Sequence, residues 1–179
     1  MAHSQLIAFY RGQGPDVAGR KIDDIWGFDH AQLEAVHDYI QWLFPSPKPS
    51  QYNGQAPLFD DETVTVFAGD AELKQRVLRS LSLMLDFYGL QTTGQPGDGS
   101  LLIVKAANYV DRRANWQDAP AGHLNHNLLR LTRIIECLRL CDLGSYSLAL
   151  VACLSSIQAE QQQQIPAKTL AFWKQAAEV

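Results

Sequence analysis

The first half of the chain contains two segments in which apolar residues recur at the spacing of an α-helix. Over 28–45, one helical face collects Leu33, Val36, Ile40 and Leu43. Asp29 precedes this run as a candidate N-cap, Gln32 is placed to complete a capping box, and Pro45 ends the run. The pattern predicts one continuous amphipathic helix over this segment.

The second segment follows after a connection rich in proline. Its apolar face consists of Leu73, Val77, Leu81, Leu85 and Tyr88. Gly89 stands at the C′ position, where a left-handed residue commonly ends a helix. Between the two long helices, Asp60 can cap a short helix that runs through Phe67.

The pattern is less decisive after this helix. The segment 92–100 is rich in Gly and Pro, which predicts an exposed flexible loop that proteases can cut. In the next segment, 101–116, Leu101 to Val104 fits a strand, whereas the following alanines suit a helix. We expect a helix over 101–116.

The strongest apolar pattern lies between His123 and Cys141. One face collects Leu124, Leu128, Leu131, Ile135 and Leu138, and a wider arc adds Leu129 and Ile134. So wide an apolar arc predicts a helix enclosed on several sides. We therefore expect this helix at the centre of the fold.

Three signals organise the end of the chain. Ser145 is expected to cap a helix, Gln161–Gln164 to form a polar turn, and Pro166 to occupy N1 of a last helix. Together the segments predict one irregular all-α domain of six or seven helices. The domain covers 1–179.

Composition agrees with one ordinary globular domain. Of 179 residues, 46% are hydrophobic and 19% charged. The net charge of −4 speaks against nucleic acid as a partner, because phosphates are neutralised by clustered Lys and Arg. Three cysteines crowd into 137–153, which favours thiols in a reducing compartment over a disulfide framework. With no basic leader and no apolar run of about 20 residues, the expected location is cytoplasmic.

A cationic stripe runs along the predicted central helix. It consists of His126, Arg130, Arg133 and Cys137. Asn127 lies in the first turn and Arg112 can join from the preceding segment, so these residues are candidates for holding a carboxylate or phosphate. The alternative, which we favour, is that the arginines pair with acids and stabilise the fold. The acids that we consider are Asp23, Asp24 and Asp38.

A second candidate site combines aromatic rings with carboxylates. We expect Trp26, Tyr39 and Trp42 to bring aromatic faces close to three acids, which are Asp23, Asp24 and Glu34. A peptide that begins with Tyr needs a carboxylate for its ammonium group and rings for its side chain. Aromatic residues at helical spacing are also common packing residues, and this alternative stays open.

Sites for metals and cofactors find little support in the sequence. His37 and Asp38 are adjacent, but no further ligands form a recognisable set, so we predict no metal site. The chain has no Gly-rich phosphate loop, nucleophile elbow or zinc signature. We predict no cofactor and no catalytic residues.

Several runs of the sequence resemble the conserved domain of the opioid growth factor receptor family. These runs are FYRG near the start, IDDIW at 22–26, LEAVHDYIQWLFP at 33–45, LMLDFYGL at 83–90 and HNLLRLTRII at 126–135. The resemblance extends over about 9–173, which it implies to be the core of the domain. The resemblance implies an all-α fold and, for the vertebrate members, binding of an opioid pentapeptide with effects on proliferation.

The resulting hypothesis is a module that binds a small peptide or an anionic small molecule. The alternatives are a structural or protein-interaction module, and an enzyme that acts on a phosphorylated or carboxylate substrate. The sequence predicts no oligomeric state.

Overall fold

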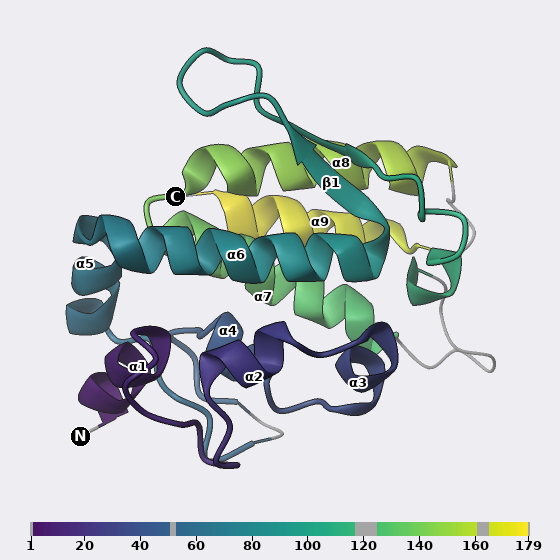
Figure 1. Ribbon diagram of the computed structural model, residues 1–179. Coiled ribbons are helices and arrows are strands. Elements are labelled where there is room, and N and C mark those ends of the chain that lie inside the picture. The colour runs from purple at the N-terminus through teal and green to yellow at the C-terminus, as the bar shows by residue number, and fades with distance from the viewer. Residues whose placement is uncertain (1, 51–52, 117–124, 161–164, 179) are drawn as a thin grey trace. The chain divides into compact units, whose positions relative to one another are not determined.

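The computed structural model describes residues 2–50, 53–116, 125–160 and 165–178. Within them lie nine α-helices, one short 3-10 helix and one two-stranded antiparallel sheet (Figure 1). The prediction of a mostly helical fold is confirmed, whereas a strictly all-α fold of six or seven helices is wrong. The chain divides into two compact units, one built from the residues up to Ser80 with Leu140–Asp142, the other from Leu81–Arg139 and the residues after Asp142.

The first unit contains five helices and the beginning of a sixth. They are α1 (Ala2–Tyr10), α2 (Ile22–Trp26), α3 (His30–Ala35), α4 (Ile40–Leu43), α5 (Asp61–Gly69) and α6 (Ala71–Tyr88), the last of which continues into the second unit. Neither α1 nor α2 was expected from the apolar spacing. Both are short, and α2 spans too few turns to show a period.

Aromatic side chains fill the core of this unit. The rings of Phe9 and Trp42 meet edge to face at 5.2 Å, and those of Tyr10 and Phe67 at 4.8 Å. Phe59 packs on Phe67 at 5.2 Å. Such pairs contribute about 0.5–1.5 kcal/mol beyond the area that they bury. They fix α1, α4 and α5 against one another.

The predicted continuous helix over 28–45 is interrupted. Asp29 caps α3 and forms the capping box with Gln32 as predicted, but Val36 is extended, with φ −89° and ψ 131°. The hydroxyl of Tyr39 donates to the carbonyl of Leu33 at 3.0 Å, the group that would accept from residue 37 in a continuing helix.

Side-chain burial supplies the physical reason for the break. Trp42 follows Leu33 by nine positions, so a continuous helix would place the two about 180° apart. In the structure Leu33 is 0% and Trp42 1% exposed. The break lets both side chains enter the same core.

The second unit contains the end of α6 and all later elements except the last residue of α7. They are β1 (Leu90–Thr93), β2 (Leu102–Lys105), the 3-10 helix η1 (Arg113–Trp116), α7 (His126–Leu140), α8 (Gly144–Glu160) and α9 (Ala167–Ala177). Helix α8 packs alongside both α9 and β2. Figure 1 shows the hairpin loop, which joins β1 to β2, extending away from α8 in the same unit.

Helix α7 is the central helix of this unit, in agreement with its wide apolar arc. Three neighbours donate hydrogen bonds to its carbonyl groups: the hydroxyl of Tyr88 to Asn127 at 2.8 Å, the hydroxyl of Ser147 to Ile135 at 3.1 Å, and the indole of Trp173 to Leu128 at 3.1 Å. These donors come from α6, α8 and α9. Buried residues lie on most sides of α7.

The prediction of a helix over 101–116 is wrong. Leu102–Lys105 is a strand, paired antiparallel with Leu90–Thr93 so that Ile103 lies opposite Thr92. The β-branched Ile103 and Val104 suit a strand, and the pairing supplies the backbone hydrogen bonds that a helix would have made internally. Turns and η1 follow it.

The predicted helix ends are partly right. Asp60 caps α5 through the backbone N–H of Thr63 at 2.9 Å, as expected. Ser145 is not a cap, because α8 already begins at Gly144, and Pro166 is the N-cap of α9 rather than its first helical residue. The predicted turn Gln161–Gln164 lies outside the described residues. None of the helices in the described ranges is long and apolar enough to cross a membrane.

Candidate functional site

Helix α2 presents two carboxylates of the predicted peptide site to solvent. Ile22 and Ile25 are fully buried and anchor the helix, which turns Asp23 and Asp24 outward. A carboxylate oxygen of Asp24 accepts the backbone N–H of Lys21 at 2.7 Å, so this side chain also holds the first turn of α2. Asp23 lies 3.7 Å from a guanidinium nitrogen of Arg79, with both side chains more than 60% exposed.

Trp26 closes the same helix beside these acids. Its indole Nε1–H donates to the hydroxyl of Ser80 at 3.0 Å, which fixes the orientation of the ring. The guanidinium carbon of Arg79 lies 3.9 Å from the ring centroid, and that of Arg76 lies 5.9 Å away. The ring is half-buried. Asp23, Trp26 and Arg79 therefore form one accessible group of an acid, an aromatic ring and a cation.

The other two aromatic candidates lie in the core of the first unit. Tyr39 is 0% exposed, and its ring packs edge to face on Phe28 at 5.9 Å. Trp42 packs on Phe9. These contacts give Tyr39 and Trp42 clear structural roles, and they place neither ring on the surface with Trp26.

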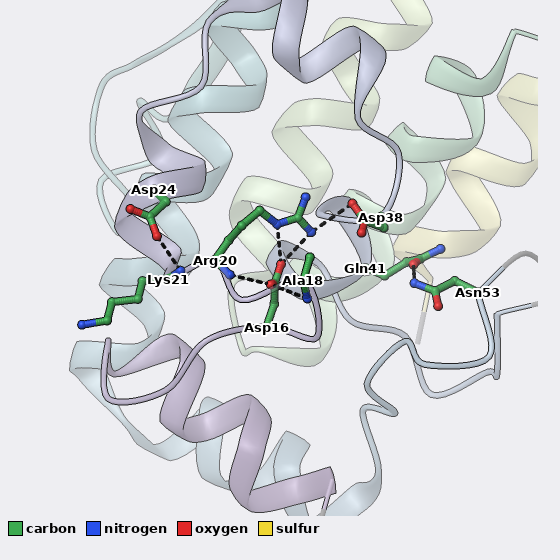
Figure 2. A network of polar contacts seen from close by, with 8 residues as sticks. All are labelled: Asp16, Ala18, Arg20, Lys21, Asp24, Asp38, Gln41 and Asn53. Atoms are coloured by element: carbon green, nitrogen blue, oxygen red, sulfur yellow. Dashed lines mark hydrogen bonds and ion pairs between the residues drawn. The ribbon is translucent and has the colours of Figure 1, made fainter.

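An ionic network around the buried Asp16, near α4, was not identified from the sequence (Figure 2). The Asp16 side chain is fully buried and accepts the backbone N–H groups of Ala18 and Arg20, each at 2.9 Å. Its carboxylate also binds the guanidinium of Arg20 at 2.6 Å, and Arg20 reaches Asp38 at 2.9 Å. Burial alone would lower the pKa of Arg20, but hydrogen bonds and charge from the two acids outweigh it and raise that pKa. The network ties the loop after α1 to the break before α4.

The cationic stripe runs along α7 from His126 to Cys137. The side chain of Asn125 accepts the backbone N–H of Asn127 at 2.8 Å, and the amide oxygen of Asn127 accepts from Arg130 at 3.1 Å. Arg130 is only 5% exposed, whereas His126 and Arg133 are half-buried. Burial lowers the pKa of Arg133 from its usual value, and the neighbouring Cys137 and Glu136 offset part of that effect.

Arg112 serves the end of another helix. Its Nε–H donates to the carbonyl of Phe87 at 3.0 Å, and its guanidinium lies 5.2 Å from the ring of the same residue. Asn115 donates to that carbonyl at 2.7 Å, and the indole of Trp116 donates to the carbonyl of Tyr88 at 3.1 Å. Carbonyls in the last turn of a helix have no partner within the helix, so these donors cap α6. Sequence reasoning missed this role because the capping residues were assigned to a helix of their own.

The predicted residues thus fall into two groups in different units. Asp23, Asp24 and Trp26 lie together on α2, while His126, Asn127, Arg130 and Arg133 lie together on α7. Across the described ranges, no three side chains among His, Cys, Asp and Glu converge as metal ligands would. Arg79 and Ser80, which complete the surroundings of Trp26, were not singled out, because no spacing in the sequence links α6 to α2.

Comparison with known proteins places the chain in a family. The opioid growth factor receptor (OGFr) conserved region matches residues 5–178. The human opioid growth factor receptor is 35% identical over 138 residues, which cover 74% of this chain and 19% of that protein. The mouse opioid growth factor receptor-like protein 1 is 34% identical over 139 residues, covering 74% of this chain and 27% of that protein.

The chain therefore spans between about a fifth and about a quarter of the length of these relatives. No solved structure shows a significant match to it. Since the family match runs over nearly the whole sequence, the chain belongs to the opioid growth factor receptor conserved-region family.

Proposed function

We propose that this chain is a binding domain for a short peptide, which it takes up through the peptide's N-terminal ammonium group and an aromatic side chain. Its relatives are named opioid growth factor receptors, which supports a ligand-binding role. The site that we propose consists of Asp23, Asp24 and Trp26.

One observation carries this proposal: two exposed carboxylates stand beside an accessible indole on α2. The two acids offer oxygens to an ammonium group. The Trp26 ring, held by Ser80 at 3.0 Å, offers a face for an aromatic or cationic group. A ligand that carries both groups within a few bonds can contact both at once.

The chemistry also sets the expected strength of binding. Ion pairs at exposed positions contribute about 0.2–1 kcal/mol, and exposed cation–π contacts about 0.5–1 kcal/mol. Binding by this site should therefore be modest and should weaken as salt rises, because exposed charges are screened.

Calorimetric titration with a pentapeptide that begins with Tyr tests the proposal. Acetylating the peptide N-terminus removes the ammonium charge and should weaken binding about tenfold, as should Trp26→Ala in the protein. The double variant Asp23→Asn with Asp24→Asn should also bind the peptide about tenfold more weakly than the parent. Asp111→Asn, which removes an exposed acid outside the proposed site, should bind as the parent does. Equal affinity for the acetylated peptide would contradict the proposal.

A second candidate is an anion site on the first half of α7. It is favoured by the half-buried His126 and Arg133, which lie two turns apart on the same side of α7, because basic groups on one helix face attract an anion. If this site operates, inorganic phosphate or a small carboxylate should raise the melting temperature of the parent but not that of Arg133→Met. No change in the parent would exclude it.

A further inference from the structure

We propose that Arg79 is a built-in competitor that occupies the cation position of the site on α2. This inference rests on the proposed peptide site and names the residue that limits its affinity. The ligand group that it assigns to the position is a cation carried on a hydrocarbon frame, such as the ammonium of a peptide N-terminus.

The Arg79 guanidinium lies where the ammonium group of a bound peptide is expected to lie. Its guanidinium carbon lies 3.9 Å from the centroid of the Trp26 ring, and a guanidinium nitrogen lies 3.7 Å from the Asp23 carboxylate. One cation thus makes both interactions that the site offers, one with the ring and one with the acid.

Arg79 is also easy to displace. Its side chain is 62% exposed and that of Asp23 is 64% exposed, so the ion pair between them is weak in water. The long side chain can move into solvent and leave the ring face and the carboxylate to another cation.

The site itself does not depend on Arg79. The Trp26 indole is fixed by its hydrogen bond to Ser80, whose hydroxyl in turn donates to the backbone carbonyl of Arg76 at 3.1 Å. The buried Ile22 and Ile25 hold α2 in place. Removing the Arg79 guanidinium should therefore leave the ring and the acid where they are.

The test compares variants of Arg79 in the same calorimetric titration. Arg79→Ala and Arg79→Gln remove the cation, and each should bind the Tyr-initiated peptide about threefold to thirtyfold more tightly than the parent. Arg79→Lys keeps a cation and should stay within about twofold of the parent. The matched control is Arg11→Ala, which removes an exposed arginine paired with Asp70 at 3.1 Å in the same unit and should leave the affinity unchanged.

Tetramethylammonium, which carries only the cation, serves as a second probe. It should bind detectably more tightly to Arg79→Gln than to the parent, with a change in tryptophan fluorescence that Trp26→Phe abolishes. If the parent binds the peptide and neither Arg79 variant gains affinity, the competitor role is wrong while the peptide site stands. If the parent and both variants bind neither probe, the peptide site itself is wrong, and the competitor role falls with it.

Discussion

Arg130 is a cation placed almost entirely in the protein interior. It is 5% exposed and donates to the amide oxygen of Asn127, a residue that is itself 1% exposed. A buried guanidinium held in this way is better suited to stabilising α7 than to meeting a ligand from solvent.

Replacing Arg130 by Met should therefore destabilise the fold. Met keeps much of the apolar stem but removes the donor to Asn127, and a buried acceptor left without its bond costs about 1–3 kcal/mol. Arg133→Met, at a half-buried position on the same helix, should cost less. Urea unfolding of the two variants measures the difference. Equal melting of Arg130→Met and the parent would contradict a structural role for Arg130.

Burial should make the three cysteine thiols unreactive in the folded protein. Cys137, Cys141 and Cys153 are buried and outside any disulfide, and burial raises the pKa of Cys153 to about 11. Because the thiolate is the reactive form, Cys153 should resist an alkylating reagent at pH 8 until the chain unfolds. Mass spectrometry after a timed pulse checks this. Labelling of Cys153 as fast as in urea would contradict it.

The same shift predicts how stability depends on pH. In the unfolded chain the thiol of Cys153 ionises near its ordinary pKa of about 8.5. Above that pH the folded state binds more protons at this position than the unfolded state, so stability should fall as pH rises toward 11. Cys153→Ser should remove this contribution in urea melts recorded from pH 7 to 10.

Gly89 shows how one backbone position connects two elements. It ends α6 with φ +74°, and a Cβ at this position would lie 2.5 Å from the Cα of Tyr109. The left-handed conformation alone costs a residue with a Cβ about 1–2 kcal/mol, and contact with backbone adds to it. Gly89→Ala should thus destabilise by more than about 2 kcal/mol.

Gly69→Ala is the matched control for this change. Its added Cβ would meet nothing within 4 Å, and Gly69 does not have a positive φ. Thermal unfolding should place this variant at or slightly above the parent, while Gly89→Ala melts well below it. Similar melting of the two variants would mean that the turn after α6 tolerates a side chain.

Elements marked by strong local signals were predicted well. The period of Leu73, Val77, Leu81 and Leu85 and the glycine after Tyr88 suffice for α6, and the arc of leucines suffices for α7. In both helices the apolar residues that form the buried face recur at helical spacing within the segment itself, so the local sequence is enough to predict them.

Elements that depend on distant partners were predicted poorly. The break between α3 and α4 contains neither Gly nor Pro, and its causes are the burial of Trp42 and the contacts of Tyr39 and Asp38. Likewise β2 exists because Leu90–Thr93 offers a pairing partner. The candidate site also combines local and distant residues. The acids and the indole of α2 are neighbours in the sequence and were predicted together, whereas Arg79 and Ser80 come from α6 and were not predicted.

At the scale of the molecule, the hairpin between β1 and β2 stands out among the described residues for its exposure. Every residue from Gln91 to Ser100 is exposed. Brief treatment with a nonspecific protease should cut first within 94–100, because this segment can enter a protease active site without unfolding an element. Mass spectrometry identifies the cut, and the far-UV circular dichroism of the cut protein should be nearly unchanged. A first cut inside α7 or α8 would contradict this account.

The central claim about the molecule is that Trp26, beside Asp23 and Asp24, receives a ligand's ammonium group and aromatic side chain. The most direct measurement follows the indole N–H signals of the four tryptophans in a ¹⁵N-labelled sample, with the Trp26 signal identified through Trp26→Phe. On titration with a Tyr-initiated peptide, the Trp26 signal should shift progressively and saturably, and the N-acetylated peptide should need about tenfold higher concentration to reach the same shift. A stationary Trp26 signal, or equal shifts with both peptides, would contradict the claim.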